Sequence, residues 1–577
     1  MLLPLLIHWF GPHGENIVSN VPQSPGTSYK SPCQAVVFPH YSIARIVDFV
    51  LFSGPLTMFA TQMQGRAITW GITVACGSGF FLFGYDQGVF GGILNDKNFL
   101  KTFNNPDSTI QAQITSTYYL GAIFGAIFSR FIGDKIGRRK AIMLGSIFLT
   151  IGGALQASAS TLAHMIIGRI VGGVGTGLNT TAIPMWQVET CKQHHRGRLV
   201  IMELVLNITG IAVTSWMNYG FTFLHDNSVS WRFPLAFQSF WAIVTFCLVL
   251  IMPESPRWLV LRGRLDEAQH ILARMMSADT NDPAVLTALN ILSATVIHER
   301  EAETAATANL LRRTNEDRTQ TLRRIALGAG LAFMQQLCGV NIIANYLPIV
   351  LTRSVGLSDR LALILSAVYS HALTLWATAS MLAIDSLGRK ALLVAGATGQ
   401  GIAFFLIAAG IKIGTYNMSI FAVVFIFVYN FFFGISFLSI PWLYPAEINS
   451  QAMRNLGTSV STAVNWTFVY VIVLVTPLGI DNLGWRFYLM FGVFNLAFLP
   501  VLWYCYVETA GLSLEQIDRV FEVQFDGRGA GVNLKQARKQ VLLEAEVVGG
   551  GDGKGFVSGT LGVKAVEGEG ADHVENI

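Results

Sequence analysis

Long apolar runs recur along the chain between about residue 67 and residue 507, separated by short joints that carry charged residues, glycine or proline. Each run is about 20 residues long, the length that a helix rising about 1.5 Å per residue needs to cross a hydrocarbon core about 30 Å thick. The pattern predicts an all-α membrane protein with twelve transmembrane helices, six before a polar stretch and six after it. The predicted spans are 67–92, 114–133, 141–159, 162–186, 199–222, 233–252, 325–351, 361–384, 391–412, 420–446, 455–479 and 485–507.

Three segments outside the spans lack this pattern. Residues 253–324 are rich in Glu, Arg, Ala and Leu, and predict short amphipathic helices that link an N-terminal bundle (67–252) to a C-terminal bundle (325–507). Residues 508–577 are Gly-rich and charged, which predicts a mostly disordered cytoplasmic tail. Residues 1–66 hold only an apolar run too short to span a membrane. We expect them to be a disordered extension, which is either not part of the native protein or a regulatory tail.

Composition agrees with a membrane protein and narrows its function. Of the 577 residues 52% are hydrophobic and only 13% are charged, whereas soluble domains have about 25% charged residues. The net charge of +4 is spread along the chain, so nothing indicates nucleic-acid binding. The six cysteines form no CxxC pair, and no metal-ligand set or nucleophile with its base is apparent. We therefore expect neither an enzyme nor a bound metal or cofactor.

Lys and Arg gather in alternate joints, at 130–140, 192–198 and 389–390. By the positive-inside rule these joints face the cytoplasm. With an even number of spans, both termini and the 253–324 stretch then lie on the same side.

The two halves share an internal repeat at a separation of about 250 residues. The joint Asp134-Lys-Ile-Gly-Arg-Arg returns as Asp385-Ser-Leu-Gly-Arg-Lys, and a glutamate followed seven residues later by arginine appears after the fourth and the tenth span. Two homologous bundles suit an alternating-access carrier, in which one bundle rocks against the other. The alternative is that the basic joints only set topology. The acidic residues kept beside them argue against it, because Asp and Glu contribute little to orientation.

We expect the repeated charged residues to form ion pairs between the bundles, closing the cytoplasmic side while a central site faces outward. Glu189 would pair with Arg138 or Arg196, and Glu447 would pair with Arg389 or Arg454. An exposed pair contributes only ~0–1 kcal/mol, so a network is needed. The residues assigned to this cytoplasmic gate are Asp134, Arg138, Glu189, Arg196, Glu254, Arg257, Asp385, Arg389, Glu447 and Arg454.

The motifs, taken in order over residues 66–515, resemble those of the sugar porters of the major facilitator superfamily, particularly the fungal members. Each motif is weak alone, and the ordered set is specific. The resemblance implies two pseudo-symmetric six-helix bundles and transport of a sugar (hexose, pentose or disaccharide) or polyol. Besides the gate residues, the motifs are Gly84-Tyr-Asp-Gln-Gly88, Gly168-Arg-Ile-Val-Gly172, Pro184-Met-Trp-Gln-Val-Glu189, Gln335-Gln-Leu-Cys-Gly-Val-Asn341, Pro441-Trp-Leu-Tyr-Pro-Ala-Glu447, Asn465-Trp466 and Glu508-Thr-Ala-Gly511.

Ionisable groups inside spans cost at least ~2.5 kcal/mol near the bilayer centre, so Asp86 and Arg169 need an explanation. In proton-coupled sugar porters, the carboxylate matching Asp86 carries the proton and the arginine matching Arg169 lies near it. A changing distance between the two side chains would load and release a proton. The resemblance thus implies that a proton is the coupling ion. The alternative is a fixed Asp86–Arg169 ion pair in a passive carrier.

A sugar site needs amides for the hydroxyl groups and an aromatic face for the apolar side of the ring. The family motifs place substrate contacts at Gln335, Gln336, Asn341, Trp442 and Asn465. The alternative for these residues is polar packing between helices.

Two positions depart from the family. Leu204 stands where sugar porters usually carry a substrate-binding glutamine, and Glu203 precedes it. Glu203 is a possible substrate or proton site, or a carboxylate near the cytoplasmic end that reaches toward water. Asn345, followed by Tyr346, stands where an aromatic gate residue is usual. The first change, which removes an amide, puts ordinary glucose-like recognition in doubt.

Three hypotheses follow. The first is a monomeric, proton-coupled importer of a sugar or polyol at the plasma membrane. The second keeps the fold but makes the protein a passive facilitator, or a carrier of a non-sugar such as a quinate-like acid. The third is a non-transporting nutrient receptor, which the tail, without a recognisable signalling motif, does not favour.

Overall fold

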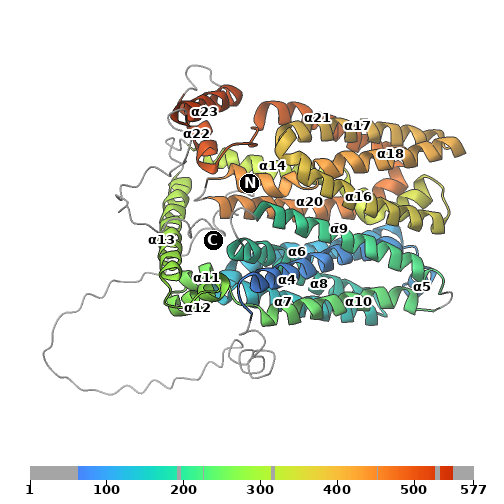
Figure 1. Ribbon diagram of the computed structural model, residues 1–577. Helices are drawn as coiled ribbons and strands as arrows, with labels where there is room; N and C mark the ends of the chain where they lie inside the picture. Colours follow the sequence, from blue (N-terminus) through green and yellow to red (C-terminus); the bar gives the residue numbers. More distant parts are fainter. Residues whose placement is uncertain are drawn as a thin grey trace. The chain divides into compact units, whose positions relative to one another are not determined.

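The computed structural model describes residues 63–191, 196–224, 227–312, 319–450, 453–526 and 533–549. The N-terminal bundle has six long helices, which lie side by side as the blue to green group of Figure 1, and a short helix α5 (Lys97–Thr102) at one end. The long helices are α4 (Arg66–Ile93), α6 (Ser108–Ile136), α7 (Arg138–Ser158), α8 (Leu162–Thr190), α9 (Arg196–Phe221) and α10 (Val229–Ile251).

The C-terminal bundle repeats this order, with two of its spans broken into shorter helices. The first span bends at Gly339, where φ is +95°, and the fourth is interrupted between Ile435 and Ile440. The elements are α14 (Thr321–Leu337), α15 (Val340–Ile349), η2 (Val350–Ser354), α16 (Asp359–Leu387), α17 (Arg389–Ile413), α18 (Tyr416–Ile435), α19 (Ile440–Ile448), α20 (Arg454–Leu483) and α21 (Trp485–Cys505).

The predicted architecture of twelve spans in two bundles is confirmed. Nine helical stretches of the described chain are long and apolar enough to cross a membrane, and α6, α8 and α9, with 29, 29 and 26 residues, complete the set. Leu382, Val424 and Phe240 are among the large apolar side chains exposed on these helices, as expected of surfaces that face lipid. The chain is therefore a multi-pass membrane protein.

Glycines bring the helices of the N-terminal bundle into close contact. A Cβ atom on Gly84 of α4 would lie 1.7 Å from the carbonyl oxygen of Asn207 in α9. One on Gly173 of α8 would lie 2.0 Å from the carbonyl oxygen of Tyr118 in α6. Small residues allow such close packing between membrane helices. The contact at Gly173 holds the Tyr118 backbone against α8, the helix that carries Arg169.

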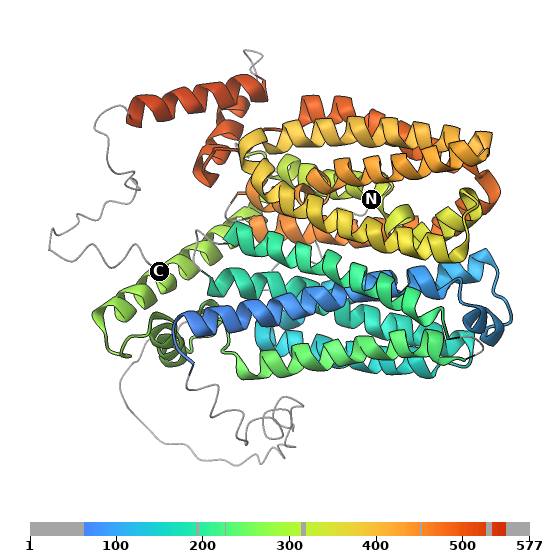
Figure 2. The same cartoon turned by 45° about the vertical axis from the view of Figure 1, so that its right-hand side comes forward.

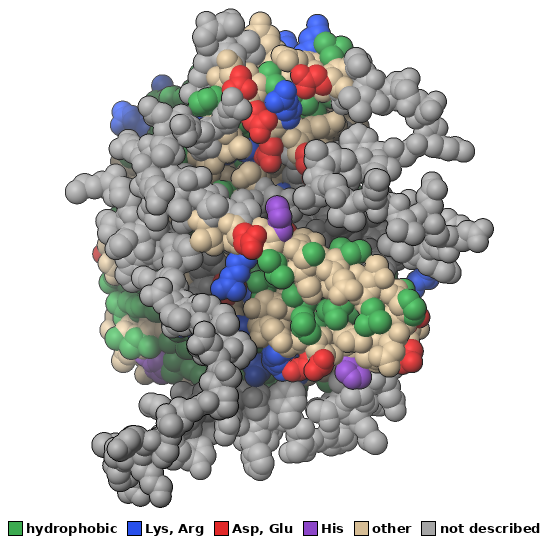
Figure 3. All heavy atoms as spheres, turned by 90° about the vertical axis from the view of Figure 1, so that its left-hand side faces the viewer, with side chains coloured by type: hydrophobic (Ala, Val, Ile, Leu, Met, Phe, Trp, Pro, Cys, Tyr) green, Lys and Arg blue, Asp and Glu red, His purple; other side chains and the backbone are tan. Residues whose placement is uncertain are grey.

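The stretch between the bundles forms α11 (Pro256–Leu261), α12 (Leu265–Met276) and α13 (Pro283–Arg312). These helices lie at one end of the bundles, which we call the linker end, and α5 lies at the opposite, distal end (Figures 1 and 2). Viewed toward the linker end, charged side chains of both signs lie among apolar ones (Figure 3). Trp258 and Leu259 of α11 pack with Val285 of α13, so the linker has a small core of its own.

Within the segment expected to be a mostly disordered tail, the structure has two helices, α22 (Leu514–Asp526) and α23 (Leu534–Gly549). α22 is attached to the C-terminal bundle, because Arg324 of α14 pairs with Asp518 and Gln320 donates to the carbonyl oxygen of Phe521 at 2.9 Å. The expected N-terminal extension up to residue 62, and the chain after residue 549, lie outside the described residues.

Candidate functional site

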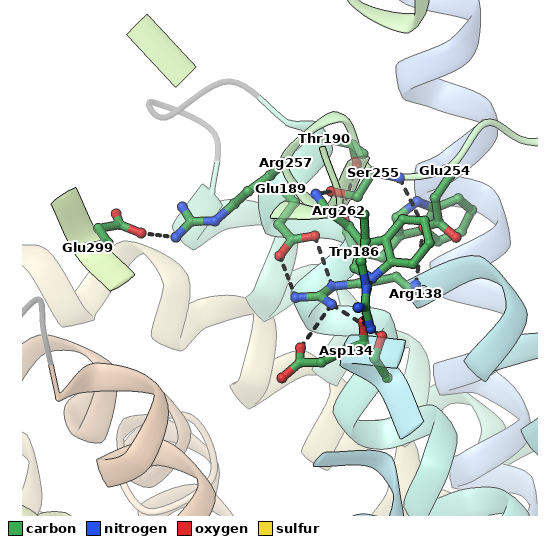
Figure 4. A network of polar contacts seen from close by, with 12 residues as sticks. Asp134, Arg138, Trp186, Glu189, Thr190, Glu254, Ser255, Arg257, Arg262 and Glu299 are labelled. Carbon is green, nitrogen blue, oxygen red and sulfur yellow. Dashed lines mark hydrogen bonds and ion pairs between the residues drawn. The ribbon is translucent and has the colours of Figure 1, made fainter. Parts of the chain in front are cut away.

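Charged side chains meet at the linker end of α6, α7 and α8 (Figure 4). The Arg138 guanidinium donates to both carboxylate oxygens of Glu189 at 3.1 Å and pairs with Asp134 at 3.2 Å. Glu254 accepts the backbone N–H groups of Arg138 and Arg139 at 3.1 and 3.2 Å, which satisfies unpaired donors at the start of α7. Burial raises the pKa of Glu254, and hydrogen bonds from the backbone N–H groups of Ser255 and Arg139 oppose that shift.

The C-terminal bundle has the same arrangement. Arg389, the first residue of α17, pairs with Glu447 of α19 at 3.0 Å. Glu508 accepts the backbone N–H groups of Arg389 and Lys390 at 2.8 and 2.9 Å. Thr509 donates to the second carboxylate oxygen of Glu447 at 2.6 Å. The internal repeat seen in the sequence thus corresponds to two equivalent charge clusters.

A glycine is required in each cluster. Gly137 and Gly388 have φ values of +97° and +87°, in the region that side chains other than glycine rarely adopt. A Cβ atom on Gly137 would lie 2.4 Å from the Glu254 carboxylate, and one on Gly388 would lie 2.5 Å from that of Glu508. Each glycine therefore permits both the sharp turn and the close approach of the glutamate.

The predicted pairs of Glu189 with Arg138 and of Glu447 with Arg389 both form, but each pair lies within one bundle and does not join the two. α7 packs against α8, and α17 contacts α19, so the charged ends of neighbouring helices meet there. Arg257 pairs with Glu299 of α13, inside the linker. Arg454 is the first residue of α20, and the side chains of Arg196 and Asp385 lie outside the described part of the structure.

Asp86 is enclosed within the N-terminal bundle, with only 1% of its surface exposed. Tyr118 of α6 donates its hydroxyl hydrogen to Asp86 Oδ2 at 3.1 Å, and Asp86 Oδ1 has no hydrogen-bond partner. The Tyr118 hydroxyl also lies 2.6 Å from that of Thr176 in α8. Because the single hydroxyl hydrogen of Tyr118 points to Asp86, Thr176 is the donor in the second bond.

Arg169 lies close to this carboxyl group but forms no ion pair with it. Its guanidinium donates to two backbone carbonyl oxygens of α6 at 3.2 Å and lies 4.3 Å from the ring centres of Tyr118 and Phe90. Arg169 Nη1 has no hydrogen-bond partner. The fixed Asp86–Arg169 ion pair of the passive alternative is thus not the arrangement found. Tyr118, which the sequence did not single out, contacts both residues.

Four of the five predicted substrate residues belong to one continuous row of buried amides. Asn465 donates to Gln335 Oε1 at 2.9 Å, and Gln336 donates to the same oxygen at 3.3 Å. Asn341 donates to Gln336 Oε1 at 2.6 Å, and Asn345 donates to Asn341 Oδ1 at 3.2 Å. Hydrogen bonds between neighbouring amides leave each group able to exchange its partner for a ligand hydroxyl.

The fifth residue, Trp442, lies in α19 and is half-buried. A different tryptophan, Trp466, packs beside the row: it is 1% exposed, and its ring centre is 5.6 Å from that of Phe83 and 6.1 Å from that of Tyr119. Its Nε1 has no hydrogen-bond partner. The sequence placed Trp466 in a motif beside Asn465 without assigning it a role, and that adjacency was the available signal.

Glu203 does not reach toward water. It is 2% exposed, and neither carboxylate oxygen has a hydrogen-bond partner. Its helix, α9, packs against α4, the helix that carries Asp86. Leu204 is also buried, so an apolar side chain occupies the position of the missing family glutamine.

Hydrogen bonds join the two bundles in the distal half of the described structure. The Tyr119 hydroxyl of α6 donates to Asn345 Oδ1 of α15 at 2.6 Å. Arg353 also donates to Gln111 at 3.3 Å, and Trp216 donates to His371 at 3.2 Å. A cavity of about 30 Å³ lies near them between α4, α9, α15 and α16, with room for about one water molecule.

Comparisons with known proteins agree with this architecture. The family described as sugar (and other) transporter matches residues 71–521. The MFS-type transporter oryC of Aspergillus oryzae is 41% identical, over 80% of this chain and 86% of the length of oryC. The sugar transporter STL1 of Saccharomyces cerevisiae is 35% identical, over 80% of this chain and 83% of its own.

Among solved structures, the proton:xylose symporter XylE bound to 6-bromo-6-deoxy-D-glucose superposes with a TM-score of 0.67. The superposition covers 79% of this chain and 100% of the XylE chain, with 23% of the residues identical. At that identity the similarity establishes the fold of two six-helix bundles.

Proposed function

The chain belongs to the sugar (and other) transporter family of the major facilitator superfamily, and on that basis we propose that it carries a sugar or polyol across a membrane together with a proton. The linker end carries the basic joints, so the positive-inside rule makes it cytoplasmic. We place the protein, as a monomer, in the plasma membrane. No cofactor is needed beyond the coupling proton.

The observation that supports proton coupling is that Asp86 is buried with a single hydrogen-bond donor. A buried carboxylate is costly unless several donors stabilise it, and Asp86 has one donor, Tyr118, and no ion pair. Such a group readily accepts a proton in this state. A movement that brings Arg169 closer would favour the ionised form and release the proton. Arg169 has a free Nη1 donor with which to make that contact.

Alternating access follows from the distribution of contacts between bundles. The described hydrogen bonds between bundles lie in the distal half, so we assign the structure to a state closed on the outer side. The linker-end charge clusters brace each bundle internally, so each bundle would move as a unit when the outer contacts break. That movement is the rocking expected of a duplicated carrier.

The amide row is the proposed substrate site. Gln335, Gln336, Asn341 and Asn465 offer donors and acceptors to hydroxyl groups, and Trp466 adds an aromatic face with an unpaired N–H. Several relatives are named sugar or glucose transporters, which supports this substrate class.

A second candidate is a carrier of a non-sugar. It is favoured by one observation: the buried Leu204 offers no hydrogen bond where the family usually has a glutamine. A substrate with an apolar edge would fit such a site better than glucose does.

An uptake screen of the purified protein in proteoliposomes tests both candidates. Radiolabelled hexoses, pentoses, disaccharides, polyols and quinate are offered at two external pH values. Uptake of a sugar or polyol that rises with an inward proton gradient is the expected result. Saturable uptake of quinate alone would favour the second candidate, and no uptake of any compound would contradict both.

A further inference from the structure

Asn345 joins the amide row to the other bundle through a hydrogen bond. Its Oδ1 accepts the Tyr119 hydroxyl at 2.6 Å, and its Nδ2 donates to Asn341 Oδ1 at 3.2 Å. Asn345 is 3% exposed and Tyr119 is 1% exposed, so water does not compete for these bonds. An amide can accept on one side and donate on the other, which neither a phenylalanine nor an aliphatic side chain can do.

The backbone places this amide at a point of bending and of close contact. Tyr346, the next residue, has non-helical dihedral angles (φ −126°, ψ 16°), and Pro348 follows within α15. On the facing helix α4, a Cβ atom added to Gly91 would lie 3.3 Å from the Asn345 carbonyl oxygen. The two bundles therefore meet tightly at Asn345, on a helix that already bends there.

Tyr119 connects this contact to the carboxyl group of Asp86 through its neighbour. Tyr118 directly precedes Tyr119 on α6 and donates its hydroxyl hydrogen to Asp86. The rings of the two tyrosines are in edge contact, with their centres 5.4 Å apart. A shift of α6 that breaks the Tyr119–Asn345 bond moves Tyr118 as well.

From this arrangement we infer that Asn345 couples closure of the distal half to the hydrogen bonds of the amide row. We call Asn345 with its hydrogen bond to Tyr119 the latch. This inference rests on the proposed alternating-access function. When a ligand hydroxyl takes over an amide of the row, the Asn341 side chain changes partners. Asn345 then keeps only the longer 3.4 Å contact with the Asn341 backbone carbonyl oxygen, and the bond to Tyr119 weakens. The latch thus replaces, in this chain, an aromatic gate residue with a hydrogen bond across the bundles.

The test measures opening of the distal half and needs no transported compound. Ser366 lines the small cavity between the bundles and is 6% exposed. A Ser366→Cys reporter is placed in the full chain in nanodiscs, and its labelling rate by a hydrophilic thiol reagent is followed by peptide mass spectrometry. The parent without the reporter gives the background from native cysteines.

Tyr119→Phe and Asn345→Leu should each raise the labelling rate about 2- to 10-fold, the factor that corresponds to one buried hydrogen bond. The labelling rate of the double variant should not exceed that of either single variant, because both changes remove the same hydrogen bond. Tyr488→Phe is the matched control: it also removes a buried hydroxyl, but its 2.7 Å contact with Ser354 stays inside the C-terminal bundle. Its labelling rate should equal that of the parent.

Unchanged labelling in Tyr119→Phe would overturn the latch, even if Asn345→Leu failed to fold, because phenylalanine keeps the ring packing. Asn341→Leu tests the row, since it leaves the Tyr119–Asn345 bond in place and removes the side-chain oxygen that accepts from Asn345. Only the longer 3.4 Å contact with the backbone carbonyl oxygen of Asn341 then remains. Faster labelling is expected, and an unchanged rate would refute the link to the row. Failure of the uptake screen with a positive labelling result would count against the proposed function alone.

Discussion

Tyr118 donates its hydroxyl hydrogen to Asp86 at 3.1 Å while the Arg169 guanidinium lies 4.3 Å from the centre of the Tyr118 ring. The tyrosine therefore contacts both members of the expected charge pair, which do not pair with each other. The carboxyl group has one donor and one oxygen without a hydrogen-bond partner.

Tyr118→Phe is expected to impair coupling more than substrate exchange. The Asp86 carboxylate formed after proton release would lose the Tyr118 donor, and hydrogen bonds to charged groups contribute ~1.5–3 kcal/mol. Uptake driven by a pH gradient should fall about tenfold or more relative to exchange at equal pH on both sides. Tyr488→Phe serves as the control, and an equal fall in both activities would show a structural role only.

Replacing Glu189 by Gln should lower the thermal stability of the detergent-solubilised protein. It leaves the Arg138 side chain, 6% exposed, with a weakened partner, and breaking a buried pair costs ~3–5 kcal/mol. Glu267→Gln is the control, because its pair with Arg264 is about half exposed on both sides and contributes ~0–1 kcal/mol. Equal melting temperatures for the two variants would refute the bracing role of the cluster.

Gly137→Ala should destabilise the protein more than Gly263→Ala. Both positions have positive φ, +97° and +70°, so an alanine at either one strains the backbone, by ~1–3 kcal/mol. Only at Gly137 does the added methyl group collide with a side chain, the Glu254 carboxylate, whereas nothing lies within 4 Å of a Cβ on Gly263. Thermal unfolding of the two variants measures the difference, and a larger loss at Gly263 would contradict it.

Glu203→Met should raise thermal stability, because an unsatisfied buried polar group costs ~1–3 kcal/mol and methionine fills a similar volume. If Glu203 acts in transport, the stabilised variant will transport more slowly or with altered pH dependence. Uptake by Glu203→Met and Glu203→Gln separates the roles of charge and hydrogen bonding. A loss of stability in the Met variant would mean that the carboxyl group has a stabilising partner in the folded protein.

The spans were predictable because a hydrocarbon core imposes length and hydropathy on every helix. Asp86 and Arg169 stood out because charges are rare inside spans. Tyr118 gave no such signal, since a tyrosine on a membrane helix is ordinary and only the packing at Gly173 fixes its partner. The partners of Arg138 and Arg389 were also ambiguous, because a repeated motif allows pairing within a bundle or between bundles. Only the neighbouring helices decide between them.

The central claim, proton coupling through Asp86, is tested most directly by comparing wild type with Asp86→Asn in proteoliposomes, using the compound found in the uptake screen. One pH unit with 100 mV supplies ~3.7 kcal/mol, enough for accumulation of roughly a few hundredfold. The wild type should accumulate the compound above its external concentration. Asp86→Asn should only equilibrate it, while still exchanging labelled for unlabelled compound. Accumulation by Asp86→Asn equal to that of the wild type would contradict the account.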